Sequence, residues 1–197
     1  MAYFDWHEQP GYFADVTRHF APSAELLDIG CGNGWLAEHF PSWTGLDGSP
    51  DAVERGRERG REIVLGNVNV DLPFPDAAFD GVVMKDLLEH VDDPVALVRE
   101  ARRVLRPGGT VFASSPDAQR WVWNDYTHKR PFTRKAYRML FADNGFAVRE
   151  AGYESVMPGT SIVSQRMPDH RRPAPLRAAA WLPIVRRNVY VVATRQG

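Results

Sequence analysis

Hydrophobic residues recur along the chain in short runs, and these runs alternate with segments whose apolar positions follow the spacing of a helix. Most of the short runs end at Gly or Asp, which is typical of buried strands. Alternating strands and helices predict an α/β protein in which helices cover a mostly parallel sheet. We predict seven strands, at 25–30, 42–47, 61–66, 79–85, 109–114, 146–151 and 188–194.

Helix-like spacing and capping residues predict where the covering helices begin and end. Ser49-Pro50 and Asp93-Pro94 each place a capping side chain before a proline at the first helical position. The third predicted helix carries its apolar residues on one face and stops at the Pro-Gly-Gly stretch 107–109. We predict four helices, at 34–40, 50–59, 93–105 and 133–143.

We expect residues 1–197 to form a single domain, because 44% apolar residues can fill one core in a chain of this length. Its predicted parts are an N-terminal lid or helix at 1–23, a core at 24–154, an insertion at 155–187 and the last strand at 188–197. The insertion is rich in proline and arginine, with one short helix near 175–182. Its six arginines indicate either attraction of an anionic acceptor or membrane headgroups, or a solvated basic face.

Charge and composition exclude several classes of function. Twenty-four basic and 25 acidic side chains give a net charge of -1, so we expect no nucleic-acid partner. The first residues do not resemble a signal peptide, and no apolar run has the roughly 18 residues of a membrane span. We therefore expect a cytoplasmic protein without integral membrane association. Cys31 is the only cysteine, which excludes a disulfide within the chain and a cysteine metal cluster, and we identify no metal ligands.

The most informative segment is an apolar strand that runs into three alternate glycines, with the sequence Leu26-Leu27-Asp28-Ile29-Gly30-Cys31-Gly32-Asn33-Gly34. Glycines let a backbone turn sharply and approach a ligand closely. A dinucleotide fingerprint requires its third glycine at position 35, which holds Trp35. The G-x-G-x-G spacing after Asp28 instead resembles motif I of the class I S-adenosylmethionine-dependent methyltransferases. The alternative is a glycine-rich turn of an ordinary α/β protein.

The resemblance extends beyond the glycine loop. The sequences LEHV at 88–91 and VLRPGG at 104–109 are similar to elements of that family. The similarity is good over 24–115 and looser over 133–152. It implies a three-layer Rossmann-like fold, with a seven-stranded sheet of order 3-2-1-4-5-7-6 whose last strand is antiparallel. It also implies S-adenosylmethionine as the cofactor.

The resemblance assigns cofactor contacts to the carboxyl ends of the strands. Asp47 would hold the ribose diol, because a carboxylate accepts two parallel hydrogen bonds from vicinal hydroxyls; alternatively, it is a turn residue or a cap. Asn67 stands where the family usually has an acidic residue that accepts from the adenine amino group, and its carbonyl can still accept. The expected cofactor-binding residues are Asp28, Gly30, Cys31, Gly32, Gly34, Asp47, Gly48, Ser49, Asn67, Val68, Lys85, Asp86 and Leu87.

Residues 121–133 place four aromatic side chains among charged ones, a pattern that fits neither a buried helix nor a strand. Connections at this position of the fold leave the ligand edge of the sheet, so we predict part of the acceptor pocket here. The alternative is a loop whose tryptophans pack on the core. We expect Phe132 to be a core residue and Thr133 to cap the next helix. The expected substrate-binding residues are Tyr12, Trp121, Trp123, Tyr126 and Arg130.

A sulfonium methyl group is already activated, so the enzyme needs to align the acceptor and exclude water but needs no protein nucleophile. A hydroxyl acceptor must lose a proton, whereas a neutral amine has a free lone pair. His128, supported by Asp125, is the expected catalytic residue, and His90 is its competitor. An orienting or structural role is the alternative for Glu89 and His90, and a solvent-exposed surface position is the alternative for His128.

These observations predict an S-adenosylmethionine-dependent methyltransferase that modifies an oxygen or nitrogen atom of a small molecule, for example a natural product or an anionic metabolite. Two alternatives stay open. One is an NAD(P)-dependent oxidoreductase, which the glycine spacing disfavours. The other is a non-catalytic cofactor-binding scaffold of the same fold, which the intact glycine loop and Asp47 disfavour. The sequence does not indicate the oligomeric state.

Overall fold

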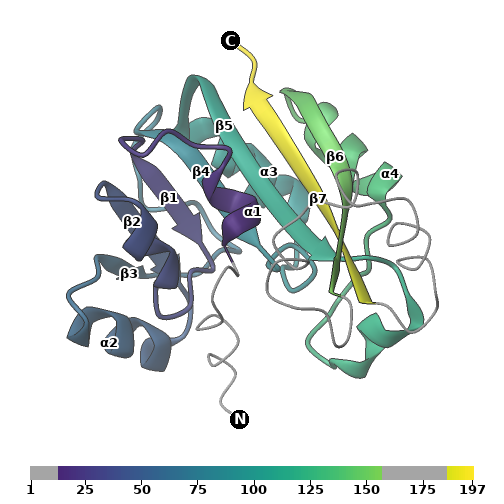
Figure 1. Ribbon diagram of the computed structural model, residues 1–197, viewed down its shortest axis with the longest axis horizontal. Coiled ribbons are helices and arrows are strands. Elements are labelled where there is room, and N and C mark those ends of the chain that lie inside the picture. Colours follow the sequence, from purple (N-terminus) through teal and green to yellow (C-terminus); the bar gives the residue numbers. More distant parts are fainter. Residues whose placement is uncertain (1–12, 157–185) are drawn as a thin grey trace.

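The computed structural model describes residues 13–156 and 186–197 (Figure 1). Tyr12, most of the predicted N-terminal lid and most of the predicted insertion lie outside these ranges. Within them, one sheet has the order β3-β2-β1-β4-β5-β7-β6, as the family resemblance implied. The strands are β1 (Leu26–Ile29), β2 (Trp43–Asp47), β3 (Ile63–Leu65), β4 (Phe79–Lys85), β5 (Leu105–Pro116), β6 (Phe146–Val156) and β7 (Arg186–Arg195).

Strand direction also follows the expectation. β1 to β5 pair in parallel, whereas β7 runs antiparallel to both β5 and β6. The β6–β7 ladder is longer than predicted and extends from Phe146 paired with Arg195 to Val156 paired with Arg186. Both ends of the predicted insertion therefore belong to this ladder.

The helices predicted at 34–40, 50–59, 93–105 and 133–143 are present, and the predicted caps are confirmed, whereas the short helix predicted near 175–182 lies outside the described residues. The side chains of Ser49, Asp93 and Thr133 each accept a hydrogen bond from a backbone amide in the first turn that follows. The segment predicted as the first helix is a short 3-10 helix, because only five residues separate the left-handed Gly34 from the extended Phe40. The helices are α1 (Ala14–Thr17), η1 (Trp35–His39), α2 (Pro50–Glu58), α3 (Pro94–Val104), η2 (Arg120–Asn124) and α4 (Arg134–Ala142).

The start of β5 differs from the prediction. This strand begins at Leu105, which pairs with Phe79, and its register shifts before Thr110 pairs with Gly81. Gly108, with φ +81°, lies inside the shift. The Pro-Gly-Gly stretch therefore follows the end of α3 and forms an irregular part of the strand, because left-handed backbone breaks a regular ladder.

Apolar side chains cover both faces of the sheet. On one face Leu27, Val82 and Val111 pack in a buried cluster with residues of α3 and α4. On the other face Leu26 and Val83 pack with residues of α1, η1 and α2. Figure 1 shows α1 and α3 on opposite sides of the sheet, so the domain has three layers. None of the helices in the described ranges is long and apolar enough to cross a bilayer.

One acidic side chain lies among the buried residues of β1. Asp28 is only 3% exposed. Burial, and to a smaller extent the nearby charge of Asp47, raise the pKa of this carboxyl to about 7, although a contact with Trp43 and the charge of Lys85 oppose the shift. The folded protein therefore holds a proton on Asp28 at pH values where an unfolded chain has lost it.

This difference predicts how stability depends on pH. A folded-state pKa above the unfolded value near 3.9 contributes stability below about pH 4, and this contribution is lost as the pH rises to about 7. An Asp28→Asn variant has no titrating group at this position, so its stability does not fall for this reason as the pH rises. Its free energy of unfolding, relative to wild type, should rise by at most about 4 kcal/mol between pH 4 and pH 7 and then stay level. Denaturant unfolding of the cofactor-free protein measures it, with exposed Asp71→Asn as the control. A pH-independent difference would contradict the assignment.

Candidate functional site

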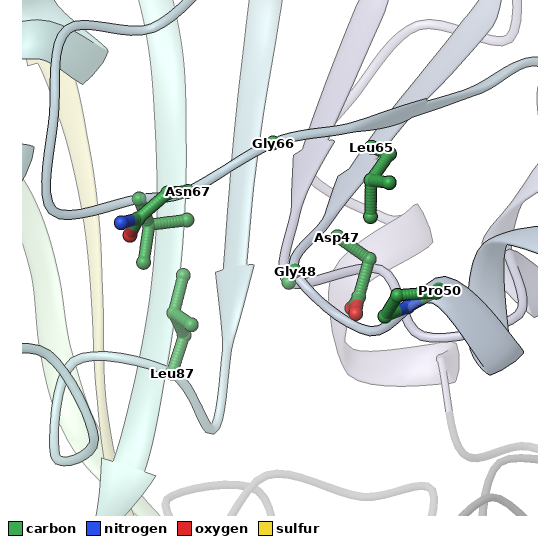
Figure 2. Close-up of a pocket in the computed structure, with 9 residues that line it drawn as sticks. Asp47, Gly48, Pro50, Leu65, Gly66, Asn67 and Leu87 are labelled. Atoms are coloured by element: carbon green, nitrogen blue, oxygen red, sulfur yellow. The ribbon is translucent and has the colours of Figure 1, made fainter.

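A pocket of about 540 Å³ opens at the carboxyl edge of the sheet, where the loops after β1, β2, β3 and β4 meet. Figure 2 shows Asp47 and Pro50 on one side of it and Asn67 and Leu87 on the other. Its volume falls within the range of small-molecule and cofactor sites. The lining residues are Gly30, Asp47, Gly48, Pro50, Leu65, Gly66, Asn67, Val68 and Leu87.

The three alternate glycines all have left-handed backbone. Their φ angles are +74° at Gly30, +57° at Gly32 and +81° at Gly34, a region that other residues rarely adopt. A Cβ atom at Gly30 would also lie 2.9 Å from a methyl carbon of Leu87 across the pocket. The glycine spacing is therefore a backbone requirement, and Gly30, which lines the pocket, leaves room for the Leu87 side chain beside it.

Asp47 connects the glycine loop to the start of α2. Its Oδ2 atom accepts a hydrogen bond of 2.7 Å from the Gly32 amide, and its Oδ1 atom accepts one of 2.8 Å from the Ser49 amide. Each carboxylate oxygen has more than one acceptor direction, so both can accept further bonds from a ligand. The structure thus places Asp47 beside the glycine loop, as expected, and its contact with a ribose stays a prediction.

Asn67 lines the pocket after β3, but its carbonyl is already in use. The Oδ1 atom accepts a 2.9 Å hydrogen bond from the Asn69 amide, and the Asn69 side chain accepts one from the Asp92 amide. These bonds hold the loop after β3 against the loop after β4. An amide carbonyl has a second lone pair, so the predicted contact with an adenine amino group remains open to Asn67.

Several residues expected to bind the cofactor lie away from the pocket lining. Asp28 and Cys31 are buried beneath the loop, and burial raises the pKa of the Cys31 thiol well above its usual range. A buried thiol with a raised pKa is a poor nucleophile. The Lys85 ammonium lies 2.8 Å from a carboxylate oxygen of Asp15 on α1 and 3.9 Å from one of Glu154 on β6.

Asp86, at the end of β4, has a strained backbone. Its φ angle is +52°, and its Oδ1 atom accepts hydrogen bonds from the Asn188 amide group at 2.9 Å and the Ser114 hydroxyl at 3.2 Å. A left-handed non-glycine residue is costly and often marks a functional site. These bonds to β5 and β7 hold the turn that leads to Leu87 and the residues after it.

The predicted acceptor loop presents its aromatic side chains unevenly. The indole of Trp121 donates to the Gln119 side chain at 2.8 Å, whereas Trp123 is 59% exposed and Tyr126 is 97% exposed. The Arg130 guanidinium donates to the Asp92 carbonyl at 2.7 Å. None of these four side chains lines the pocket described above, so their contact with a substrate stays a prediction. Phe132 is buried in the core, as expected.

The structure brings together the two histidines that the sequence treated as competitors. The ring centroids of His90, after β4, and His128, after η2, lie 4.7 Å apart. The Nδ1 atom of His128 is 2.6 Å from the Val122 carbonyl oxygen, which can only accept, so Nδ1 carries the proton. Asp125 faces the other ring nitrogen, with its Oδ2 atom 3.9 Å from His128 Nε2.

The His90 ring is oriented in the same way. Its Nδ1 atom lies 3.1 Å from the Thr127 hydroxyl oxygen and 3.3 Å from the Thr127 carbonyl oxygen. The Thr127 hydroxyl donates its own proton to Asp125 Oδ1 at 2.6 Å, so it accepts from the imidazole. Burial and the charge of His128 lower the pKa of His90, which favours the neutral ring with a lone pair on Nε2.

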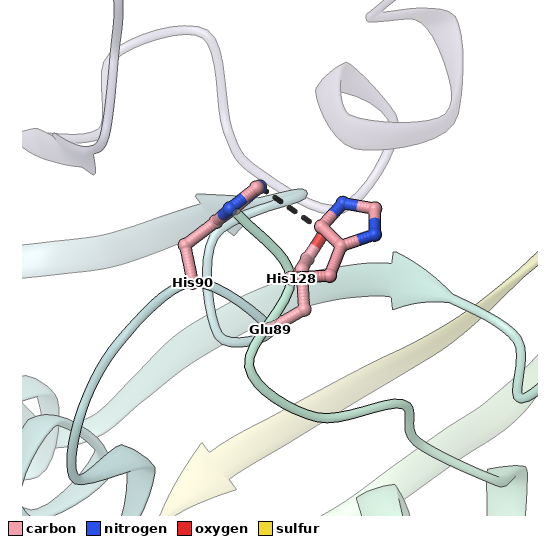
Figure 3. Close-up of side chains that lie close together, drawn as sticks. All are labelled: Glu89, His90 and His128. Carbon is pink, nitrogen blue, oxygen red and sulfur yellow. Dashed lines mark ion pairs between the residues drawn. The ribbon is translucent and has the colours of Figure 1, made fainter. Parts of the chain in front are cut away.

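Glu89 is the third member of this cluster, and sequence reasoning did not place it in the site (Figure 3). Its side chain is buried, and neither carboxylate oxygen has a hydrogen-bond partner among the described residues. Burial raises the pKa of Glu89 well above its usual range, and the charge of Asp86 adds to the effect. Its position beside His90 in the LEHV segment was the available signal.

Comparisons with known proteins agree with this geometry. A family model described as a methyltransferase domain matches residues 27–113. An uncharacterized protein of Methanocaldococcus jannaschii is 31% identical over 153 residues, which are 76% of this chain and 74% of that protein. A Xanthomonas campestris ubiquinone biosynthesis O-methyltransferase is 35% identical over 113 residues, 51% of this chain and 46% of the enzyme, so the match spans about half of each.

The fold comparison covers nearly the whole chain. The crystal structure of an S-adenosylmethionine-dependent methyltransferase from Mesorhizobium loti superposes with a TM-score of 0.71, covering 96% of this chain and all of that one at 20% identity. The pocket has the position that such a fold predicts for its cofactor, at the carboxyl edge of the sheet beside the glycine loop and Asp47. The chain therefore belongs to the class I S-adenosylmethionine-dependent methyltransferases, with S-adenosylmethionine as its cofactor.

Proposed function

We propose that this methyltransferase transfers the methyl group to an oxygen atom of a small molecule. The observation that carries the proposal is the cluster of Glu89, His90 and His128. Glu89 and His90 lie shortly after the pocket residue Leu87 in the loop after β4, and His128 joins them from the loop after η2. Two imidazoles and a carboxyl at this point serve an acceptor that must lose a proton, whereas a neutral amine does not require them.

Different pocket residues would bind different parts of the cofactor. S-adenosylmethionine supplies a methyl group that its sulfonium already activates for transfer. The Asp47 carboxylate, held by the amides of Gly32 and Ser49, would accept from the ribose hydroxyls. Asn67 and Val68, on the opposite loop, would contact the adenine. Leu87 lies close to Gly30 and would give the cofactor an apolar contact.

The histidine cluster would then act on the acceptor. His128 donates its Nδ1 proton to the Val122 carbonyl, so only Nε2 is free to interact with an acceptor hydroxyl. Thr127 and Asp125 hold the His90 ring in the matching orientation. The net charge of -1 and the O-methyltransferase activity in the name of the Xanthomonas relative support a small molecule with a hydroxyl group.

The proposal predicts that Asp47→Ala weakens binding of S-adenosylhomocysteine by tenfold or more, because ribose hydroxyls left unpaired in a closed pocket cost about 1–3 kcal/mol. Isothermal titration calorimetry measures the affinity. The same substitution releases the Gly32 and Ser49 amides, so the cofactor-free protein should also unfold at a lower temperature. Glu54→Ala, which removes an exposed carboxylate of α2, is the matched control. Equal affinities for Asp47→Ala and wild type would remove Asp47 from the ribose site.

His128→Asn should separate binding from chemistry. It should leave the affinity for S-adenosylhomocysteine within about twofold of wild type and lower turnover on the order of 10²-fold, because the Nε2 lone pair is lost. Release of S-adenosylhomocysteine in a panel of phenols, catechols and aromatic amines measures turnover. Methylation confined to the amines would contradict the oxygen acceptor. Cofactor binding without turnover on any compound would favour the scaffold alternative.

A further inference from the structure

We propose that Glu89, His90 and His128 form a binding site for one divalent transition-metal cation of the zinc type. Each residue offers one ligand atom, and the three atoms lie within 4.8 Å of one another. Figure 3 shows the side chains converging from the loop after β4 and the loop after η2. The sequence did not predict this site, because its ligands come from separate loops and have no recognisable metal-binding spacing.

The Glu89 carboxyl is the strongest indication of a ligand. A buried carboxyl without hydrogen bonds is costly, and proteins normally satisfy such a group with a partner, a charge or a metal ion. The closest basic atom is His90 Nε2, 4.0 Å from Glu89 Oε1. A cation between these two atoms and His128 would compensate the carboxylate and the lone pairs of both rings at once.

The histidines already have the arrangement of metal ligands. A metal-bound imidazole usually donates its other ring N–H to a carbonyl or a carboxylate, which fixes the tautomer and the ring orientation. His128 donates from Nδ1 to the Val122 carbonyl, and His90 donates from Nδ1 to Thr127. The lone pair of each neutral ring is therefore on Nε2, and this is the atom that can bind a cation.

The distances require only a small adjustment. Ligand atoms about 2.1 Å from one ion stand about 3–4 Å apart, so the three groups need to close by about 1 Å. Two histidines and one carboxylate are the donor set of several catalytic zinc sites and of nonhaem iron sites, in which protein ligands leave a position open. Hard cations such as Mg²⁺ and Ca²⁺ prefer oxygen ligands, and the imidazoles therefore favour a transition metal.

The open position would receive the oxygen atom of the acceptor. A cation there orients the acceptor and lowers the pKa of its hydroxyl group. This role rests on the proposed function, whereas binding of the cation does not. The substrate class that follows is a small molecule with a coordinating hydroxyl, such as a phenol or a catechol.

The test is a titration of the full chain, stripped of metals by a chelator, with Co²⁺ followed by visible absorption, and then displacement by Zn²⁺ measured by calorimetry. We expect saturation at one equivalent. Glu89→Gln keeps the size of the side chain and removes the charge, and it should weaken Co²⁺ binding by about tenfold or more, as should His128→Asn. His39→Asn, at an exposed histidine of η1, is the control and should bind like wild type.

S-adenosylhomocysteine affinity, measured on the same samples, separates this inference from the proposed function. Intact cofactor binding without saturable Co²⁺ or Zn²⁺ binding would overturn the metal site and leave the methyltransferase proposal standing. Equal Co²⁺ affinities for wild type, Glu89→Gln and His128→Asn would overturn it as well, because the cation would then bind elsewhere. If Glu89→Gln does not fold, His128→Asn alone decides the comparison.

Discussion

The Asp47 carboxylate accepts hydrogen bonds from the Gly32 and Ser49 amides, and the remainder of the cofactor pocket depends on this contact. It fixes the distance between the loop after β1 and the start of α2. Gly30 and Gly32 have left-handed backbone, and Gly30 lines the pocket without a side chain of its own. The contact therefore both shapes the pocket and keeps a negative group at its edge, where a nucleoside would present its hydroxyls.

Buried acidic groups lie around the carboxyl edge of the sheet, and burying them lowers the stability of the fold. Asp28 and Glu89 are both buried, and burial raises the pKa of each. Asp86, directly after β4, has a left-handed backbone and accepts hydrogen bonds from Ser114 and Asn188. Perturbed carboxyls and a strained residue in one region are typical of a functional site and rare in a purely structural core.

Patterns of neighbouring residues in the sequence predicted most of the helices and strands. The features that they did not predict depend on contacts between segments that are distant in the sequence. The caps at Ser49, Asp93 and Thr133 followed from residues within one helical turn. The meeting of His90 and His128 depends on the neighbouring positions of β4 and β5 in the sheet, which no pattern in either loop records. Even with the strand order known from a family resemblance, the Nδ1 contacts that fix both rings become visible only in three dimensions.

The single free lone pair of His128 limits how the cluster can act. A lone pair that binds a cation cannot accept a proton, so His128 is either a ligand or a base at a given moment. Hydrogen bonds from Thr127 hold the pKa of Asp125 below its usual range, which makes this carboxylate a poor proton acceptor. Asp125 therefore acts mainly by positioning Thr127, and through it His90. With a cation bound, the proton of an acceptor hydroxyl would pass to solvent, because the cation itself would stabilise the oxygen anion.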